Sequence, residues 1–205
     1  MKNFLFFLFI FSLTSCAIRE NNSLTSIREF QKSLNESYRN PKESPLRGEH
    51  LKNFRQHPFF PIDLKYCINA KFVRTSDAKP MLIPTSSGKN KQFIEYGKAY
   101  FTLDGKEVVL SVYQIVDLME DEQFKNYLFL PFRDQTNGAE TYGGGKYLDL
   151  TLPEKENEIL LDFNKSYHPY CAYNAYDYNC PIVPEENTLP LPVRAGVMYE
   201  DIYFH

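Results

Sequence analysis

The stretch QFIEYGKAYFTLDGKEVVLSVYQIV, residues 92–116, decides the fold class. Apolar and polar residues alternate through Gln92–Leu103 and again through Lys106–Val116, and a period of two is typical of β-strands. Asp104-Gly105 lies between the two runs. An Asp-Gly pair favours a tight hairpin because both turn positions need a positive φ. The stretch therefore predicts two long antiparallel strands.

Further segments on both sides show alternation, or a short apolar run between turn residues. We predict strands over Tyr66–Val73, Met81–Thr85, Tyr127–Phe132, Lys146–Leu152 and Glu158–Phe163. The last two should form a second hairpin through Pro153–Asn157. We expect a short helical turn over Asp117–Phe124 and one more short strand over Leu191–Val193.

Only one helix is predicted, over Ser26–Asn40. Its apolar residues Ile27, Phe30, Leu34 and Tyr38 recur at steps of three and four, which places them on one helix face. Residues 41–63 contain several prolines and should be irregular. The sequence thus predicts a mostly β fold, an antiparallel sandwich or partly open barrel with one N-terminal amphipathic helix, in a single domain over residues 26–205.

Residues 1–15 have the features of a secretory signal peptide. Lys2 precedes an apolar run, and small residues follow it. The run is shorter than the roughly 20 residues that a membrane-spanning helix needs. A buried helix of a cytosolic domain is the alternative, but a run with no polar face buries poorly on one side.

The segment Leu13-Thr14-Ser15-Cys16 resembles the lipobox of bacterial lipoproteins. The resemblance implies that Cys16 is lipidated and becomes the first mature residue, with residues 16–25 as a tether. Cys16 would then attach the protein to a membrane, since acyl chains anchor through burial of their methylene groups. This implies an exported protein in the cell envelope, at the outer membrane or the periplasmic face if the host has two membranes.

Composition excludes some classes of function. The formal net charge is −3, and we see no basic stripe, which argues against nucleic-acid binding. Cys171 and Cys180 are close enough in sequence to form a disulfide, although buried free thiols are an equal alternative. His168 with these two cysteines suggests zinc, but the spacing is generic and a disulfide would use both thiols. We therefore predict no metal and no cofactor.

Two segments carry the residues suited to chemistry. The first, Phe132–Tyr147, contains Arg133 and Lys146, which could hold an anion, and Asp134 and Glu140, which could act as acid or base. Its three consecutive glycines, 143–145, permit close approach of a ligand or another strand. An Arg–Asp pair, an Asn-Gly turn and a glycine bulge would equally make a purely structural loop.

The second segment is Asp162–Pro181. Asp162 and Asn164 have the same parity at a strand end, so their side chains should face the same side. Tyr167 begins a series of tyrosines at every third residue. Such a series could stack against a sugar or a base, or simply pack a coil onto the sheet.

Together these segments resemble the bacterial and archaeal family called domain of unknown function 1684. Phe129–Asp134 with Glu140–Gly145 resembles its first signature, and Asp162–Asn164 with Cys171–Tyr173 and Cys180-Pro181 resembles its second. The resemblance implies no particular activity. Lys146 stands where the family usually has Arg, which weakens a two-pronged anion clamp. His168 stands where the family usually has Asn, which argues against a family-wide zinc site.

Three functional hypotheses follow. The first is a module that binds a small polar ligand where the two signatures meet. The second is a hydrolase of the cell envelope with Asp134 or Asp162 as general base. The third is an envelope scaffold without a pocket, in which the signatures only hold the fold together. The residues expected to line one pocket are Arg133, Asp134, Thr141, Tyr142, Lys146, Asp162, Asn164 and Tyr167.

Overall fold

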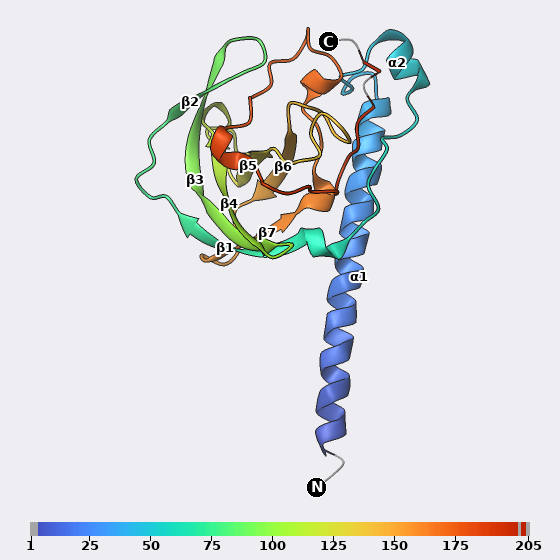
Figure 1. Cartoon of the computed structure of the whole chain (residues 1–205), viewed down its shortest axis with the longest axis vertical. Helices are drawn as coiled ribbons and strands as arrows, with labels where there is room; N and C mark the ends of the chain where they lie inside the picture. The colour runs from blue at the N-terminus through green and yellow to red at the C-terminus, as the bar shows by residue number, and fades with distance from the viewer. Residues whose placement is uncertain (1–3, 201, 204–205) are drawn as a thin grey trace.

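The computed structural model describes residues 4–200 and 202–203, with side chains from residue 20 onward. Figure 1 shows a strongly curled β-sheet with one long helix along its side. The sheet has seven strands in the order β6-β5-β4-β3-β1-β7, with β2 paired to β3. All the pairings are antiparallel, and the sheet curls into a half-barrel, as the prediction of a mostly β, partly open barrel required.

The strands lie close to the predicted segments. Their bounds are β1 Cys67–Arg74, β2 Met81–Pro84, β3 Asn90–Leu103, β4 Lys106–Ile115, β5 Tyr127–Phe132, β6 Lys146–Thr151 and β7 Glu158–Asp162. The hairpin between β3 and β4 turns at Asp104 and Gly105, which have φ values of 49° and 77°. The Asp-Gly pair thus has the positive dihedral angles that predicted this turn.

The curl of the sheet separates an inner from an outer apolar cluster. The inner cluster fills the half-barrel with side chains from every strand but β2, among them Phe72, Leu110, Leu130 and Leu161. The outer cluster packs Phe93, Tyr113, Phe129 and Tyr147 on the opposite face. Strand β6 contributes to both clusters, because successive side chains point to opposite faces.

Helix α1 spans Phe4–Arg39, so it is much longer than the predicted 26–40. Figure 1 shows its second half against the sheet and its first half extending away from the domain. Ile27 and Tyr38 of the predicted apolar face are buried. Residues 16–25, predicted as a tether, are helical, since no glycine or proline interrupts the segment.

The part of the chain that bears on the membrane anchor lies outside the described residues. Residues 1–3 and the side chains of residues 4–19 are not described, so the signal peptide and the lipidation of Cys16 stay predictions. Within the part of the chain that is described, no helix is long and apolar enough to cross a membrane.

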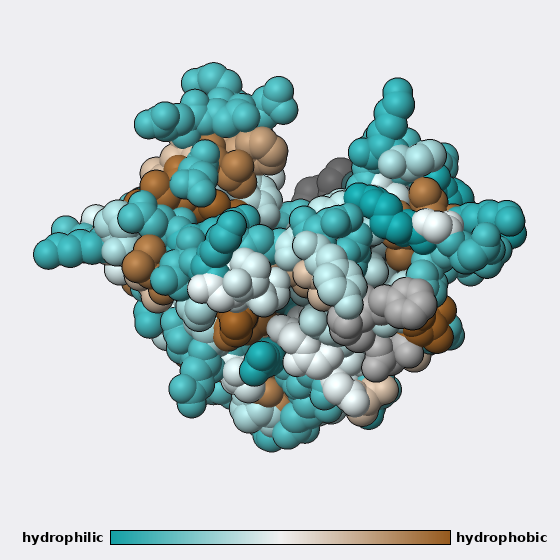
Figure 2. Space-filling view, turned by 90° about the horizontal axis from the view of Figure 1, so that it is seen from above, coloured by the Kyte–Doolittle hydropathy of each residue, from teal (hydrophilic) through white to brown (hydrophobic). Residues whose placement is uncertain are grey.

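Two predicted elements are wrong and one was missed. β6 and β7 do not form a hairpin, because the curl brings β7 beside β1 and leaves these strands at opposite edges. Leu191–Val193 is not a strand, since its main chain bonds to a side chain and to the loop after β5. Helix α2, Gly48–Asn53, interrupts the irregular segment. Figure 2 shows a mostly hydrophilic top of the molecule with small, separate apolar patches.

Candidate functional site

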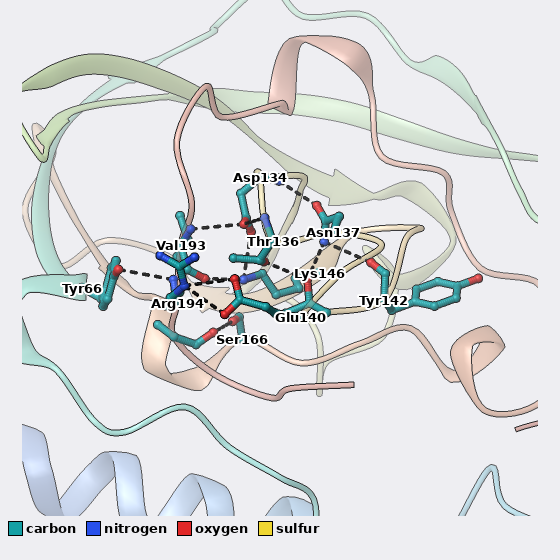
Figure 3. Close-up of polar contacts among 12 residues, drawn as sticks. Tyr66, Asp134, Thr136, Asn137, Glu140, Tyr142, Lys146, Ser166, Val193 and Arg194 are labelled. Atoms are coloured by element: carbon teal, nitrogen blue, oxygen red, sulfur yellow. Dashed lines mark hydrogen bonds and ion pairs between the residues drawn. The ribbon is translucent and has the colours of Figure 1, made fainter. Parts of the chain in front are cut away.

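The loop that joins β5 to β6 holds an enclosed ion pair. Lys146 Nζ lies 2.9 Å from Asp134 Oδ2, and neither side chain has any exposed surface. Nζ also donates to the Val193 carbonyl at 2.7 Å, and Asp134 Oδ1 accepts from the Thr136 and Val193 amides. Figure 3 shows these groups converging beneath the loop. Burial lowers the pKa of Lys146, and the Asp134 charge opposes that shift.

Three further polar side chains of this loop, Thr136, Asn137 and Thr141, are bonded to one another. Thr141 Oγ1 lies 2.8 Å from Thr136 Oγ1 and accepts from Asn137 Nδ2 at 2.9 Å. Asn137 also donates to the Tyr142 carbonyl and accepts from the Asp134 amide. Most polar groups inside the first signature therefore have partners within it, whereas the buried Arg133 Nε has no hydrogen-bond partner among the described residues.

The glycine run serves packing at its last position. Gly145 has a φ of 102°, and a Cβ there would lie 2.8 Å from the Phe132 carbonyl oxygen and 2.7 Å from Val183. Glycine thus permits the close approach of two strands, which was one of the alternatives for this run. Arg133 is half-buried beside it, and its main chain bonds to Asn187 and Leu189.

The second signature begins with a carboxylate that caps a turn. Asp162 Oδ1 accepts from the Asn164 amide at 3.2 Å and from Asn164 Nδ2 at 3.0 Å. The same Asn164 side chain joins the amide and the carbonyl of Asp63. Burial raises the pKa of Asp162, although the bonds from Asn164 oppose it. The two side chains contact each other, but Asn164 lies in a 3-10 turn, Phe163–Lys165, and not in the strand whose alternation the prediction used. Their bonds tie the end of β7 to the segment before β1.

The two signatures meet along the seam of the half-barrel. Tyr147 of β6 and Tyr167 exchange main-chain hydrogen bonds of 2.8 and 3.0 Å. The rings of Phe132 and Phe163 pack edge to face with centroids 5.1 Å apart. These contacts close the curled sheet where β6 and β7 are not paired. The two signatures therefore lie side by side, as expected, but they meet through ring packing and main-chain hydrogen bonds and not around a shared pocket.

As a result, the expected pocket residues do not line one cavity. Asp162 borders a cleft of about 550 Å³ between β6 and β7. Tyr167 borders a cavity of about 500 Å³ between α1 and the sheet. The candidates absent from the described lining of both are Arg133, Asp134, Thr141, Tyr142, Lys146 and Asn164. The Asp134 side chain has no exposed surface from which it could reach a substrate in this conformation.

The cavity that Tyr167 borders has four tyrosines among its lining residues, and we call it the tyrosine cavity. Helix α1 contributes Phe30 and Leu34 to its wall. The ring-bearing residues at this cavity are Phe30, Tyr147, Tyr167, Tyr170 and Tyr178, and the polar ones include Lys91, Asp149, Asp177 and Asn179.

Asp149 is the polar centre of the tyrosine cavity. The Tyr127 and Tyr167 hydroxyls both donate to its Oδ1, at 2.8 and 2.7 Å. Within the described residues, Oδ2 makes no hydrogen bond, and the residue is exposed. Desolvation by the surrounding groups raises the pKa of Asp149, and the two phenols oppose that shift. The carboxylate thus has one saturated and one available oxygen.

Sequence reasoning missed Asp149 and Tyr127 as site residues. Asp149 has the parity of Tyr147 in β6, so the alternation itself places it on the outer face. A single carboxylate in the outer apolar face of a strand is the signal that could have identified it. Tyr127 could not be found in this way, because its contact with Asp149 depends on how β5 pairs with β6.

A second cavity of about 420 Å³ lies between α2 and the C-terminal segment, and His57 borders it. His57 is packed against the rings of Tyr38 and Phe54, and its Nε2 has no hydrogen-bond partner within the described residues. Burial lowers its pKa to about 3. Its Nδ1 lies 3.5 Å from the Tyr173 hydroxyl, which lies 3.3 Å from His168 Nδ1.

His168 has a structural role in this arrangement. Burial holds its pKa well below the ordinary value, so the ring is neutral. The Tyr142 amide can only donate, at 3.5 Å, to His168 Nε2, which leaves the proton on Nδ1. Cys171 and Cys180 form a disulfide. The zinc ligands considered above are therefore used otherwise, and no group of three or more metal-ligating residues occurs in the described part of the chain.

Comparison with known proteins identifies a family without a known function. Residues 52–198 match the family described as "Protein of unknown function (DUF1684)". An uncharacterized protein from Haloarcula marismortui, solved by solution NMR, is similar in fold with a TM-score of 0.70 and 27% sequence identity. The similarity covers 88% of this chain and 96% of that one. No curated protein matches the chain.

Proposed function

The chain belongs to the DUF1684 family of proteins of unknown function, and we propose that it binds a small neutral saccharide in the tyrosine cavity. The observation that carries the proposal is the available Oδ2 of Asp149 among tyrosine rings. A carboxylate oxygen accepts hydrogen bonds from ligand hydroxyls, and such bonds are stronger than those between neutral groups. Tyrosine rings offer flat apolar faces to the C–H groups of a sugar ring.

The charges around the cavity favour a neutral ligand. Asp177 forms an ion pair with Arg47 at 3.4 Å and accepts from Asn174 at 2.8 Å. Asp149 and Lys91 make no ion pair within the described residues, and their charges are opposite. The lining is therefore close to neutral overall. A strongly charged ligand of either sign would meet one attractive and one repulsive unpaired charge, so the lining favours neither sign.

The test is calorimetric titration of residues 17–205 with glucose and N-acetylglucosamine. We expect binding by at least one of them, and at least a tenfold loss in Asp149→Asn, since a hydrogen bond to a charged group contributes about 1.5–3 kcal/mol. Asn keeps an oxygen for the two phenols but replaces the available acceptor by a donor. Asp77→Asn, an exposed change of equal charge, should bind like the wild type.

Two results would overturn the proposal. One is the absence of a measurable heat or thermal shift with these sugars at millimolar concentration. The other is binding that Asp149→Asn leaves unchanged. Either result would support the scaffold hypothesis, because the buried polar groups of the first signature already bond mostly to one another.

Export and lipid anchoring at Cys16 form a separate part of the proposal. Their support is the lipobox-like segment before Cys16 and the direction of α1, whose first half extends away from the domain (Figure 1). An anchor there would attach the domain to a membrane through α1. Mass spectrometry of the full chain expressed in a bacterial host should find acyl groups on Cys16, and Cys16→Ser should release the protein to the soluble fraction. An unmodified N-terminus with the first 15 residues intact would contradict this part.

A further inference from the structure

The tyrosine cavity has a neighbouring cleft that shares one wall residue with it. The cleft between β6 and β7 measures about 550 Å³ and is bordered by Asn69, Thr151, Leu160 and Asp162. Among the described lining residues, Asp149 is the one common to both spaces. A ligand that contacts Asp149 from the tyrosine cavity therefore lies next to the cleft, which we call the seam cleft.

The edge of β6 offers main-chain hydrogen-bonding groups to the seam cleft. Tyr147 uses both its main-chain groups toward Tyr167, and the Leu152 amide bonds in the opposite direction, to Asn126. Residues alternate in the direction of these groups along a strand. Asp149 and Thr151 therefore direct their N–H and C=O groups away from β5, toward the seam.

The opposite wall of the seam cleft, formed by β7, also offers main-chain hydrogen-bonding groups. The Phe72 amide bonds to the Asn157 carbonyl, so residues of odd number in β7 face β1 and Leu160 directs its main chain to the seam. The side chains of Asn69 and Thr151 are exposed and make no hydrogen bond within the described residues. Unpaired donors and acceptors thus line both sides of the cleft.

The charges of the seam cleft largely compensate one another. Lys155 pairs with Glu158 at 2.8 Å, and Lys165 lies 3.9 Å from Asp162. A cleft with many paired charges and many neutral hydrogen-bonding groups suits a neutral ligand rich in hydroxyl groups. A charged polymer would meet few unpaired charges of opposite sign.

We propose that the ligand is an oligosaccharide, with one sugar ring against the tyrosines and the following rings along the seam cleft, and with Asp149 at the junction. The inference rests on the proposed function and extends it from a single sugar to a chain. The sugar in the tyrosine cavity gains its contacts from ring stacking and Asp149. The sugars in the seam cleft gain theirs from Asn69, Thr151 and the strand edge.

The experiment compares chain lengths on residues 17–205. Glucose and N-acetylglucosamine, with their β-1,4-linked and α-1,4-linked tetramers, are titrated against the wild type and the double variant Asn69→Ala/Thr151→Ala. We expect at least one tetramer to bind about tenfold or more tightly than its monomer, a gain equivalent to a few net hydrogen bonds. The double variant should remove most of that gain and leave the monomer affinity unchanged. Both positions are exposed, so the variant should remain folded.

The outcomes separate the inference from the proposed function. A monomer that binds through Asp149 with no gain for any tetramer overturns the inference and leaves the proposed function standing. A gain that persists in Asn69→Ala/Thr151→Ala also overturns it, because the added rings would then lie elsewhere. If no monomer and no tetramer binds, both proposals fail.

Discussion

Strand β6 carries two charged residues whose surroundings could hardly differ more. Lys146 points inward, where Asp134 and the Val193 carbonyl enclose it completely. Asp149, three residues later, points outward, where two phenols occupy one oxygen and the other is available. The difference shows that a signature rich in charged residues can be architecture, while an inconspicuous residue beside it provides the open site.

The largest expected effect is that of Asp134→Asn. Asn keeps an acceptor for the Thr136 and Val193 amides but turns a donor toward the Lys146 ammonium. Breaking a buried ion pair from one side leaves an uncompensated charge and costs about 3–5 kcal/mol. Urea denaturation at pH 7 should show this loss in the free energy of unfolding.

The double variant Asp134→Asn/Lys146→Met is the matched control. It removes the stranded charge together with its partner, so it should recover a large part of the loss. An equal loss in single and double variants would mean that packing, and not the unpaired charge, governs this region.

The second effect concerns the disulfide beside the tyrosine cavity. Cys171 and Cys180 are nine residues apart, and the chain-entropy relation gives about 2–3 kcal/mol for a loop of this size. Cys171→Ala/Cys180→Ala should lose this much stability. It should also weaken sugar binding, because Tyr170, Tyr178 and Cys180 itself border the cavity. Unchanged binding would show that the cavity wall does not depend on the bridge.

Much of the fold could be predicted from the sequence, and much less of the site. Alternation gave the strands within a few residues, and Asp104-Gly105 gave the hairpin, because both are local properties. The partner of β7 and the Tyr147–Tyr167 closure depend on the curl of the whole sheet. No local pattern encodes that curl. The sequence therefore could not show that the two segments meet through packing and main-chain bonds and do not line one pocket.

Two buried histidines, His57 and His168, should also affect the response of stability to acid. Burial lowers the pKa of His57 to about 3, whereas the unfolded chain has a value near 6.5. Between these values the unfolded state binds more protons, so His57 makes stability fall as the pH falls, by at most about 1.4 kcal/mol per pH unit. The buried His168 acts in the same direction, while Asp149 and Asp162, with raised pKa values, act in the opposite one.

His57→Phe isolates the contribution of His57. Phenylalanine keeps a ring among Tyr38, Phe54 and Tyr173 and cannot titrate. The variant should therefore lose less stability than the wild type between pH 7 and pH 5, as measured by urea denaturation at each pH. Parallel curves for the two proteins would mean that His57 is already solvated, or protonated, in the folded state.

The smallest effect on stability is expected for Asp149→Asn, the same chemical change as Asp134→Asn on the outer side of the sheet. Asn keeps the oxygen to which Tyr127 and Tyr167 donate, and its new amide group faces solvent instead of a buried ammonium. The free energy of unfolding should change by less than about 1 kcal/mol, as for most exposed positions. If Asp149→Asn instead destabilises the protein as much as Asp134→Asn, then Asp149 is a structural hub for its two tyrosines. Its available oxygen would then be no evidence for a ligand, and the contrast between the two faces of β6 would disappear.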